Sequence, residues 1–213
     1  MDRTGGEYSK EKKLFAMATM ILSIPLVLLQ RVRAFIVFPG VGEIWRIGDA
    51  VAWWENKENV RAEFFLIPGM NLRERTAITL NVEVLKEKFG LVREENVIIR
   101  PHAEHTKDQA EWAREKIEEY GISSIALFVS PYHITRAYLT LLKSLLNKKI
   151  FIPIIPVPAY VAPHVEIPET GVNAWEMIPG EVERIEDYQK KGDTATFEEL
   201  QNYLDQFWKS NIV

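Results

Sequence analysis

The sequence predicts an α/β fold: a three-layer sandwich with a mostly parallel sheet and C-terminal packing helices. After residue 33, short apolar segments alternate with amphipathic segments of helical spacing. This alternation is typical of a parallel sheet covered by helices on both faces. The apolar segments are also nearly continuous, as expected for strands that are buried on both sides.

The individual strands and helices follow from this pattern. The strands are expected at 34–38, 63–67, 96–100, 125–129 and 150–157. The intervening helices are expected at 45–56, 72–89, 107–120 and 131–147. The proline-rich segment 153–168 cannot be a regular central strand throughout, because each proline removes a backbone hydrogen-bond donor.

The composition fits a globular domain and excludes several classes of site. Of the 213 residues, 47% are hydrophobic, and the net charge is −4, which argues against a nucleic-acid partner. The chain has no cysteine, which excludes disulfides, thiolate metal ligands and cysteine nucleophiles. We expect one domain at 34–213, preceded by an apolar N-terminal segment at 1–33.

The apolar run at 14–29 has two interpretations. It is longer than the roughly 10–14 residues usual for a buried helix and shorter than the about 20 needed to cross a bilayer. Lysines precede it and arginines follow it, so the flanking charge shows little asymmetry. One interpretation is a buried helix of a cytoplasmic protein. The other is an inner-membrane anchor, through which the protein would associate with lipid.

The helices on either side of the fourth strand have well-marked starts. Thr106 and Gln109 have the T-x-x-Q spacing of a capping box, and Gly121 suits the end of that helix. Ser130 and Pro131 stand where the N-cap and the first residue of the next helix belong.

Two more helices are expected near the C-terminus. The first is expected to begin at Pro179 and to end at Gly192, and the second begins with a capping box from Thr196 to Glu199. The acidic residues of the first helix, Glu181 among them, are expected to form a solvated face without a chemical role.

The distinctive loops of the chain all follow strands. They are 39–42, 68–70, 102–106 and 130–133. In an open parallel sheet such loops meet at the carboxyl edge, where ligands bind. Free N–H groups at helix starts favour an anion there, so we expect a small anionic ligand.

The loop after the first strand is not a dinucleotide-binding fingerprint. It contains Gly40 and Gly42, but Trp45 takes the place of the third glycine and no acid closes the second strand. This argues against NAD, and such glycines are also commonly conformational. Arg46 follows in the first helical turn, where an anion would offset its unfavourable interaction with the helix dipole.

His133 and Arg136 are the sharpest candidates for chemistry. Both lie off the apolar stripe of their helix, so packing does not explain them. The dipole at a helix start disfavours imidazolium, which leaves His133 able to accept a proton. A zinc site with His102, Glu104 and His105 is an alternative, but H-x-E-H is not an established motif and we assign no metal ligands.

The same positions resemble a known family of bacterial proteins. The chain is similar to the YdcF-like family, which includes SanA and ElyC, at Gly40 and Gly42, Arg46 with Ala50, Pro68 with Gly69, Glu74, the HT-x-x-QA of 105–110 and the VSPYHITRA of 129–137. The similarity covers about 34–156, and the tail also resembles that of soluble members. It implies a Rossmann-like fold with a crevice, and it implies that the crevice is lined by Gly40, Gly69, Glu74, Thr106, Gln109, Ser130, His133 and Arg136. The chain departs from the family pattern at Pro39, Pro68 and Gln109.

The expected function combines the predicted anion-binding crevice with this resemblance. Some members of the family are associated with S-adenosylmethionine binding and others with the cell envelope. We expect a crevice that binds a nucleotide-like or phosphorylated small molecule, with S-adenosylmethionine a candidate cofactor, in a transferase reaction. The alternatives are a non-catalytic ligand-binding or envelope-regulating module and a metal-dependent hydrolase.

The residues expected to carry this function fall into two groups. The catalytic group is His133, Arg136 and Glu74. The ligand-binding group is Gly40, Gly42, Arg46, Gly69, Thr106, Gln109 and Ser130.

Overall fold

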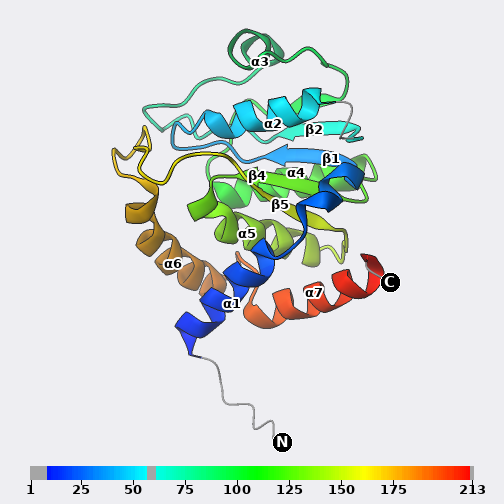
Figure 1. The fold of residues 1–213 in the computed structure, drawn as a ribbon, viewed down its shortest axis with the longest axis vertical. Coiled ribbons are helices and arrows are strands. Elements are labelled where there is room, and N and C mark those ends of the chain that lie inside the picture. The colour runs from blue at the N-terminus through cyan, green and yellow to red at the C-terminus, as the bar shows by residue number, and fades with distance from the viewer. Residues whose placement is uncertain (1–8, 57–60, 212–213) are drawn as a thin grey trace, which may run out of the picture.

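A five-stranded, all-parallel sheet forms the centre of the protein, in a computed structural model that describes residues 9–56 and 61–211 (Figure 1). The strand order is β3-β2-β1-β4-β5. The strands are β1 (Ala34–Val37), β2 (Phe64–Ile67), β3 (Val97–Ile99), β4 (Ile125–Val129) and β5 (Ile154–Pro158). This order reverses between β1 and β4, which confirms the predicted Rossmann-like sandwich and creates a switch point at the carboxyl edge.

Helices cover both faces of the sheet. They are α1 (Lys10–Leu22), α2 (Trp45–Glu55), α3 (Val82–Phe89), α4 (Thr106–Glu119), α5 (Ile134–Leu146), α6 (Ala174–Lys191) and α7 (Phe197–Asn211), with 3₁₀ turns η1 (Leu26–Arg31) and η2 (Pro131–His133). Packing joins α2 to α3, and α4 to α5. Because the chain moves in opposite directions along the sheet before and after β3, right-handed crossovers place these two pairs on opposite faces.

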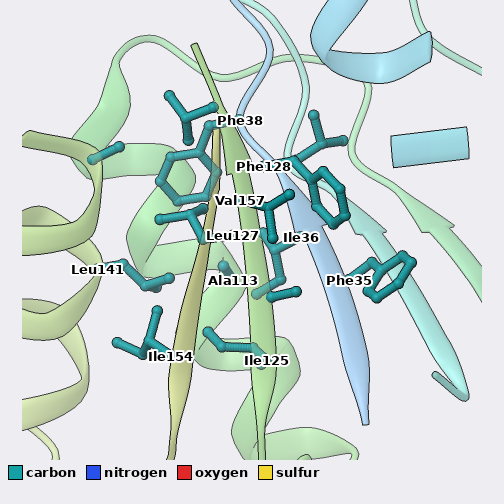
Figure 2. Packing of buried hydrophobic residues seen from close by; sticks show 14 of the residues in the cluster. Phe35, Ile36, Phe38, Ala113, Ile125, Leu127, Phe128, Leu141, Ile154 and Val157 are labelled. Carbon is teal, nitrogen blue, oxygen red and sulfur yellow. The ribbon is translucent and has the colours of Figure 1, made fainter. Parts of the chain in front are cut away.

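The core surrounds the two central strands, β1 and β4 (Figure 2). Phe35 of β1 packs edge-to-face on Phe128 of β4, with ring centroids 5.0 Å apart, and on Trp54 of α2. From the other side, α5 buries an apolar stripe that includes Leu141. Both faces of the central strands are therefore apolar, as their nearly continuous hydrophobic sequence predicts.

The predicted helix at 72–89 is wrong in its first half. Only α3 is helical, and it begins where the Asn81 side chain accepts a hydrogen bond from the Val84 N–H at 2.8 Å. The residues before it form a loop that is tied to other loops, because Glu169 accepts hydrogen bonds from the N–H groups of Arg75 and Thr76. Long-range contacts that local sequence does not show therefore override the helical pattern.

The last strand and the first tail helix also differ from prediction. β5 begins at Ile154, four residues later than expected, and lies at the edge of the sheet, where Pro156 and Pro158 are tolerated. α6 begins at Ala174, because Asn173 and Glu176 form a capping box, and it continues through Pro179. A proline removes one hydrogen bond from a helix, which the long α6 accommodates.

The N-terminal segment forms a short helix that packs on the domain. α1 contacts α5 and α7 and buries Met17 and Ile21, while Phe15 on its outer side is exposed. Across 9–56 and 61–211, no helix is both long and apolar enough to cross a bilayer. The second tail helix begins as predicted, with reciprocal hydrogen bonds between Thr196 and Glu199.

A pair of glycine substitutions tests the close approach of the β2 and β3 loops. Gly69 and Gly192 both have φ near +75° to +80°, but only at Gly69 would a Cβ lie within 2.7–2.8 Å of backbone atoms, those of Arg100 and His102. We expect Gly192→Ala to lower the free energy of unfolding by roughly 1–2 kcal/mol, from backbone strain alone. Gly69→Ala should cost roughly 1–3 kcal/mol more, from overpacking. Urea denaturation measures both, and equal losses would contradict the predicted close approach.

Candidate functional site

A pocket of about 480 Å³ lies at the carboxyl edge of the sheet, where the loops after β1, β2, β3 and β4 meet. Of the residues predicted from sequence, seven line it: Gly40, Arg46, Glu74, Thr106, Gln109, His133 and Arg136. Three do not line it: Gly42, Gly69 and Ser130. The loops converge as expected for a parallel sheet, but not every residue in them faces the pocket.

Helix α6 supplies a wall that the sequence analysis did not include. It lies beside η2 and α5, at the lower left of Figure 1. Its pocket residues recur at helical spacing along one face, and they are Met177, Glu181, Arg184, Tyr188 and Lys191. In the sequence, the only sign of this wall is the helical spacing of these mostly polar side chains. By itself it predicts a solvated face, because nothing local shows what the face packs against.

His133 is held by a buried carboxylate. Its Nδ1 lies 2.8 Å from Oε2 of Glu181, and the two side chains are 7% and 5% exposed. A carboxylate only accepts hydrogen bonds, so Nδ1 carries the hydrogen and Nε2 keeps a lone pair. Nε2 has no hydrogen-bond partner in the part of the chain that the structure describes, and His133 lines the pocket. His133 therefore presents a proton acceptor to the pocket.

The charge states of this pair follow from burial and neighbouring cations. Burial, together with nearby Arg136, lowers the pKa of His133 to about 4, outweighing the raising effect of Glu181. Burial alone would raise the pKa of Glu181, but interactions with His133 and Arg136 lower it well below its ordinary range. At neutral pH the pair is thus a neutral imidazole beside an ionised carboxylate.

Arg136 is engaged by the same carboxylate. Its Nε and one terminal nitrogen donate to the two oxygens of Glu181 at 2.7 and 2.9 Å, and the other donates to Oγ1 of Thr106 at 3.2 Å. Arg184 also donates to Glu181, at 3.0 Å. The predicted solvated face of α6 is therefore wrong at Glu181, which is a buried acceptor shared by three side chains.

Arg46 and Ser130 belong to a second buried cluster. Arg46 is ion-paired with Glu43, and it donates to Ser130 Oγ at 2.9 Å and to the Phe38 carbonyl at 3.0 Å. Glu43 also accepts from the hydroxyls of Ser130 and Tyr132, both at 2.7 Å. Burial lowers the pKa of Arg46 to about 10, so it stays charged at neutral pH. Most donors of Arg46 are thus used within the protein. We call the cluster of Glu43, Arg46, Ser130 and Tyr132 the floor of the pocket; Ser130 belongs to it without lining the pocket itself.

The Glu74 carboxylate, from the loop after β2, binds the loop after β1. Its Oε2 accepts a hydrogen bond from the Val41 N–H at 2.7 Å, and its other oxygen lies near Gly40. Partial burial raises the pKa of this carboxyl group. An internal carboxylate thus occupies a loop amide that a phosphate would otherwise use, while one oxygen remains available to the pocket.

The predicted capping box at the start of α4 is wrong. The N-cap is His105, whose Nδ1 accepts from the Asp108 N–H at 3.0 Å. Gln109 instead points inward, and its amide nitrogen donates to the carbonyls of Pro39 and Gly69 at 2.7 and 2.9 Å. Gln109 therefore joins the β1 and β2 loops, and the Thr106 hydroxyl is free to contact Arg136.

The two glycines outside the pocket serve close packing. A Cβ on Gly42 would lie 2.7–2.8 Å from the side chains of Thr76 and Pro168, and Gly42 has a φ of +75°. Gly69 makes the equally close approach described above. Their role in the described structure is conformational.

The described ranges contain no cluster of side chains that would support the zinc hypothesis. Among residues 9–56 and 61–211, no group of three or more His, Cys, Asp or Glu side chains is arranged to hold a metal ion. Nδ1 of His105 is already used as a helix cap.

Comparisons of the chain with protein-family models, curated proteins and solved structures found no match.

The stability of the protein should depend on pH through His133. Between pH 6.5 and 4.5 the unfolded imidazole binds a proton that the folded one, with a pKa of about 4, does not. Stability should therefore fall as the pH is lowered through this window, by up to roughly 2–3 kcal/mol. Urea denaturation of wild type and His133→Asn at several pH values measures the slope. Equal slopes in the two proteins would contradict a buried neutral imidazole.

Removing Glu43 should strongly destabilise the protein. Glu43→Ala leaves Arg46 buried without its carboxylate, and we expect a loss of roughly 3–5 kcal/mol in the free energy of unfolding. Glu104→Ala removes an exposed acid of the same pocket and serves as the control, with an expected change within about 0.5 kcal/mol. Similar losses in the two variants would show that the buried pair is not supporting the floor.

Proposed function

We propose that the pocket binds a nucleotide-like or phosphorylated small molecule and that His133 transfers a proton in a group-transfer reaction. The observation that carries this proposal is the His133–Glu181 pair. A neutral imidazole, held through Nδ1 by a buried carboxylate and lining a pocket, is the arrangement expected of a general base. Glu181 acts through His133 and is a positioning residue.

The start of α4 is the proposed place for the anionic group. The N–H groups of Thr106 and Lys107 have no acceptor within the described ranges, and both residues line the pocket. Free N–H groups at a helix start bind phosphate and carboxylate. Lys191, whose ammonium lies 5.4 Å from the Tyr188 ring centroid, adds positive charge. This place leaves the bond between Arg136 and Glu181 intact.

Glu74 is the proposed contact for a neutral part of the ligand. Its second carboxylate oxygen can accept a hydrogen bond from a hydroxyl, such as one on a ribose. Met177 and Tyr188 supply apolar surface on the opposite, α6 side of the site. A nucleotide or S-adenosylmethionine has such a combination of hydroxyls and an aromatic base, and both remain candidates under the proposed membership of the YdcF-like family.

A thermal-shift screen tests the proposal. Orthophosphate, nucleotides, sugar phosphates and S-adenosylmethionine are added to the whole chain, because a ligand that binds only the folded state raises its melting temperature. At 100 times its dissociation constant, a true ligand should stabilise the fold by about 2.7 kcal/mol. No shift with any of these compounds would overturn the proposed pocket.

Variants then separate catalysis from binding. With a ligand in hand, His133→Gln should retain most of the binding and lose turnover by roughly 10²–10⁴-fold, since only the proton transfer is removed. A variant of an exposed histidine on the same edge, His102→Gln, is the control. Binding without turnover in the wild type would favour a non-catalytic ligand-binding module.

A further inference from the structure

A second hollow of about 190 Å³ adjoins the pocket. It lies between α4 and α5, and it shares Lys107, Thr140 and Asp193 with the main pocket. The ion pair of Lys107 with Asp193, at 2.7 Å, stands at the boundary of the two. The hollow, which we call the α4–α5 groove, therefore continues from the helix start proposed to bind the anion.

The α4–α5 groove extends well beyond a single anionic group. On α4 it is lined by Lys107, Glu111 and Arg114, which follow one another down the helix. The rise from Lys107 to Arg114 is about 10 Å at 1.5 Å per residue. On α5 it is lined by Thr140, Lys143 and Ser144, and Asn147 and Lys148 continue the lining after the helix ends. A groove of this length fits a chain of linked anionic groups.

The charge of the groove contrasts with that of the whole chain. Its basic side chains are Lys107, Arg114, Lys143 and Lys148, against the acids Glu111 and Asp193. The chain as a whole has a net charge of −4. A local excess of cations on an acidic protein marks a surface that attracts anions.

The existing ion pairs do not close the groove to an anion. Lys143 pairs with Glu199 at 2.5 Å, with side chains that are 19% and 32% exposed, and Arg114 pairs with both Glu115 and Glu118. None of these acids lines the groove. The two carboxylates that pair with Arg114 are more than half exposed, and such pairs contribute little. Lys148 has no carboxylate partner in the described residues and is exposed. A ligand anion therefore meets Lys148 unpaired, and it shares Arg114 and Lys143 with carboxylates outside the groove.

We propose that the α4–α5 groove is a subsite for linked phosphate groups that extend from the pocket past Lys107. The ligand class is a condensed phosphate or the diphosphate of a nucleotide-linked molecule. This inference rests on the proposed function, because the first phosphate occupies the start of α4. The groove cations then bind the second and later phosphates through charge-assisted hydrogen bonds.

Isothermal titration with phosphates of increasing length tests the subsite. Orthophosphate, pyrophosphate and tripolyphosphate are titrated at constant ionic strength, since salt screens exposed charges. We expect affinity to rise with chain length. The double variant Lys143→Ala/Lys148→Ala should lower tripolyphosphate affinity roughly tenfold and leave orthophosphate affinity unchanged. The double variant Lys86→Ala/Lys88→Ala on α3, which lies away from the groove, is the matched control.

Each outcome of this experiment is decisive. If wild type binds orthophosphate but gains nothing from longer chains, or if the groove variant binds tripolyphosphate as wild type does, the subsite is overturned and the proposed pocket stands. If none of the three binds, the proposed pocket fails as well. Titration of ADP identifies the source of the phosphates: tighter binding than pyrophosphate supports a nucleotide-linked ligand, and equal or weaker binding supports a condensed phosphate.

Discussion

The buried carboxylate of Glu181 is the interaction on which the site depends. It accepts hydrogen bonds from His133, Arg136 and Arg184, and so joins α6 to the start of α5. Glu181 and Ile185 are the only buried residues of α6 in the described structure, so the helix owes much of its attachment to this carboxylate. The same contact holds the hydrogen on Nδ1 of His133 and leaves Nε2 to the pocket. One interaction therefore both attaches α6 and fixes the tautomer of His133. A buried carboxylate is stable there only because it is paired.

The pocket combines an internally satisfied floor with free groups at one side. Glu43, Arg46, Ser130 and Tyr132 bond to one another, which makes the floor rigid and leaves few of their donors for a ligand. The open N–H groups and cations lie instead at the start of α4, on α6 and along the α4–α5 groove. Fixed donors around an open site lower the cost of binding an anion, because little has to be reorganised.

Several residues were predicted in the right place for a different reason. Thr106 and Gln109 have capping-box spacing, yet His105 caps α4, which frees Gln109 to join the β1 and β2 loops. Glu74 was expected within a helix, but it lies in a loop, and this loop brings its carboxylate to the N–H group of Val41. Ser130 does precede a helix start, but its hydroxyl bonds to Glu43 across the sheet edge. The His105 cap is local, but the final partners of Gln109, Glu74 and Ser130 are all distant in sequence, so spacing along the chain could not reveal them.

The sequence by itself determined the fold class, the strands near the centre and the loops that meet at the carboxyl edge. Apolar continuity and helix starts are local properties, and a parallel sheet brings the ends of its strands to one edge. It also singled out His133 and Arg136, because polar side chains off an apolar stripe are visible in the sequence. Only the tertiary structure decided that α6 closes the pocket and that Glu181 is buried against His133. An acid on an amphipathic helix looks solvated until its partners, 45 and 48 residues away, are placed beside it.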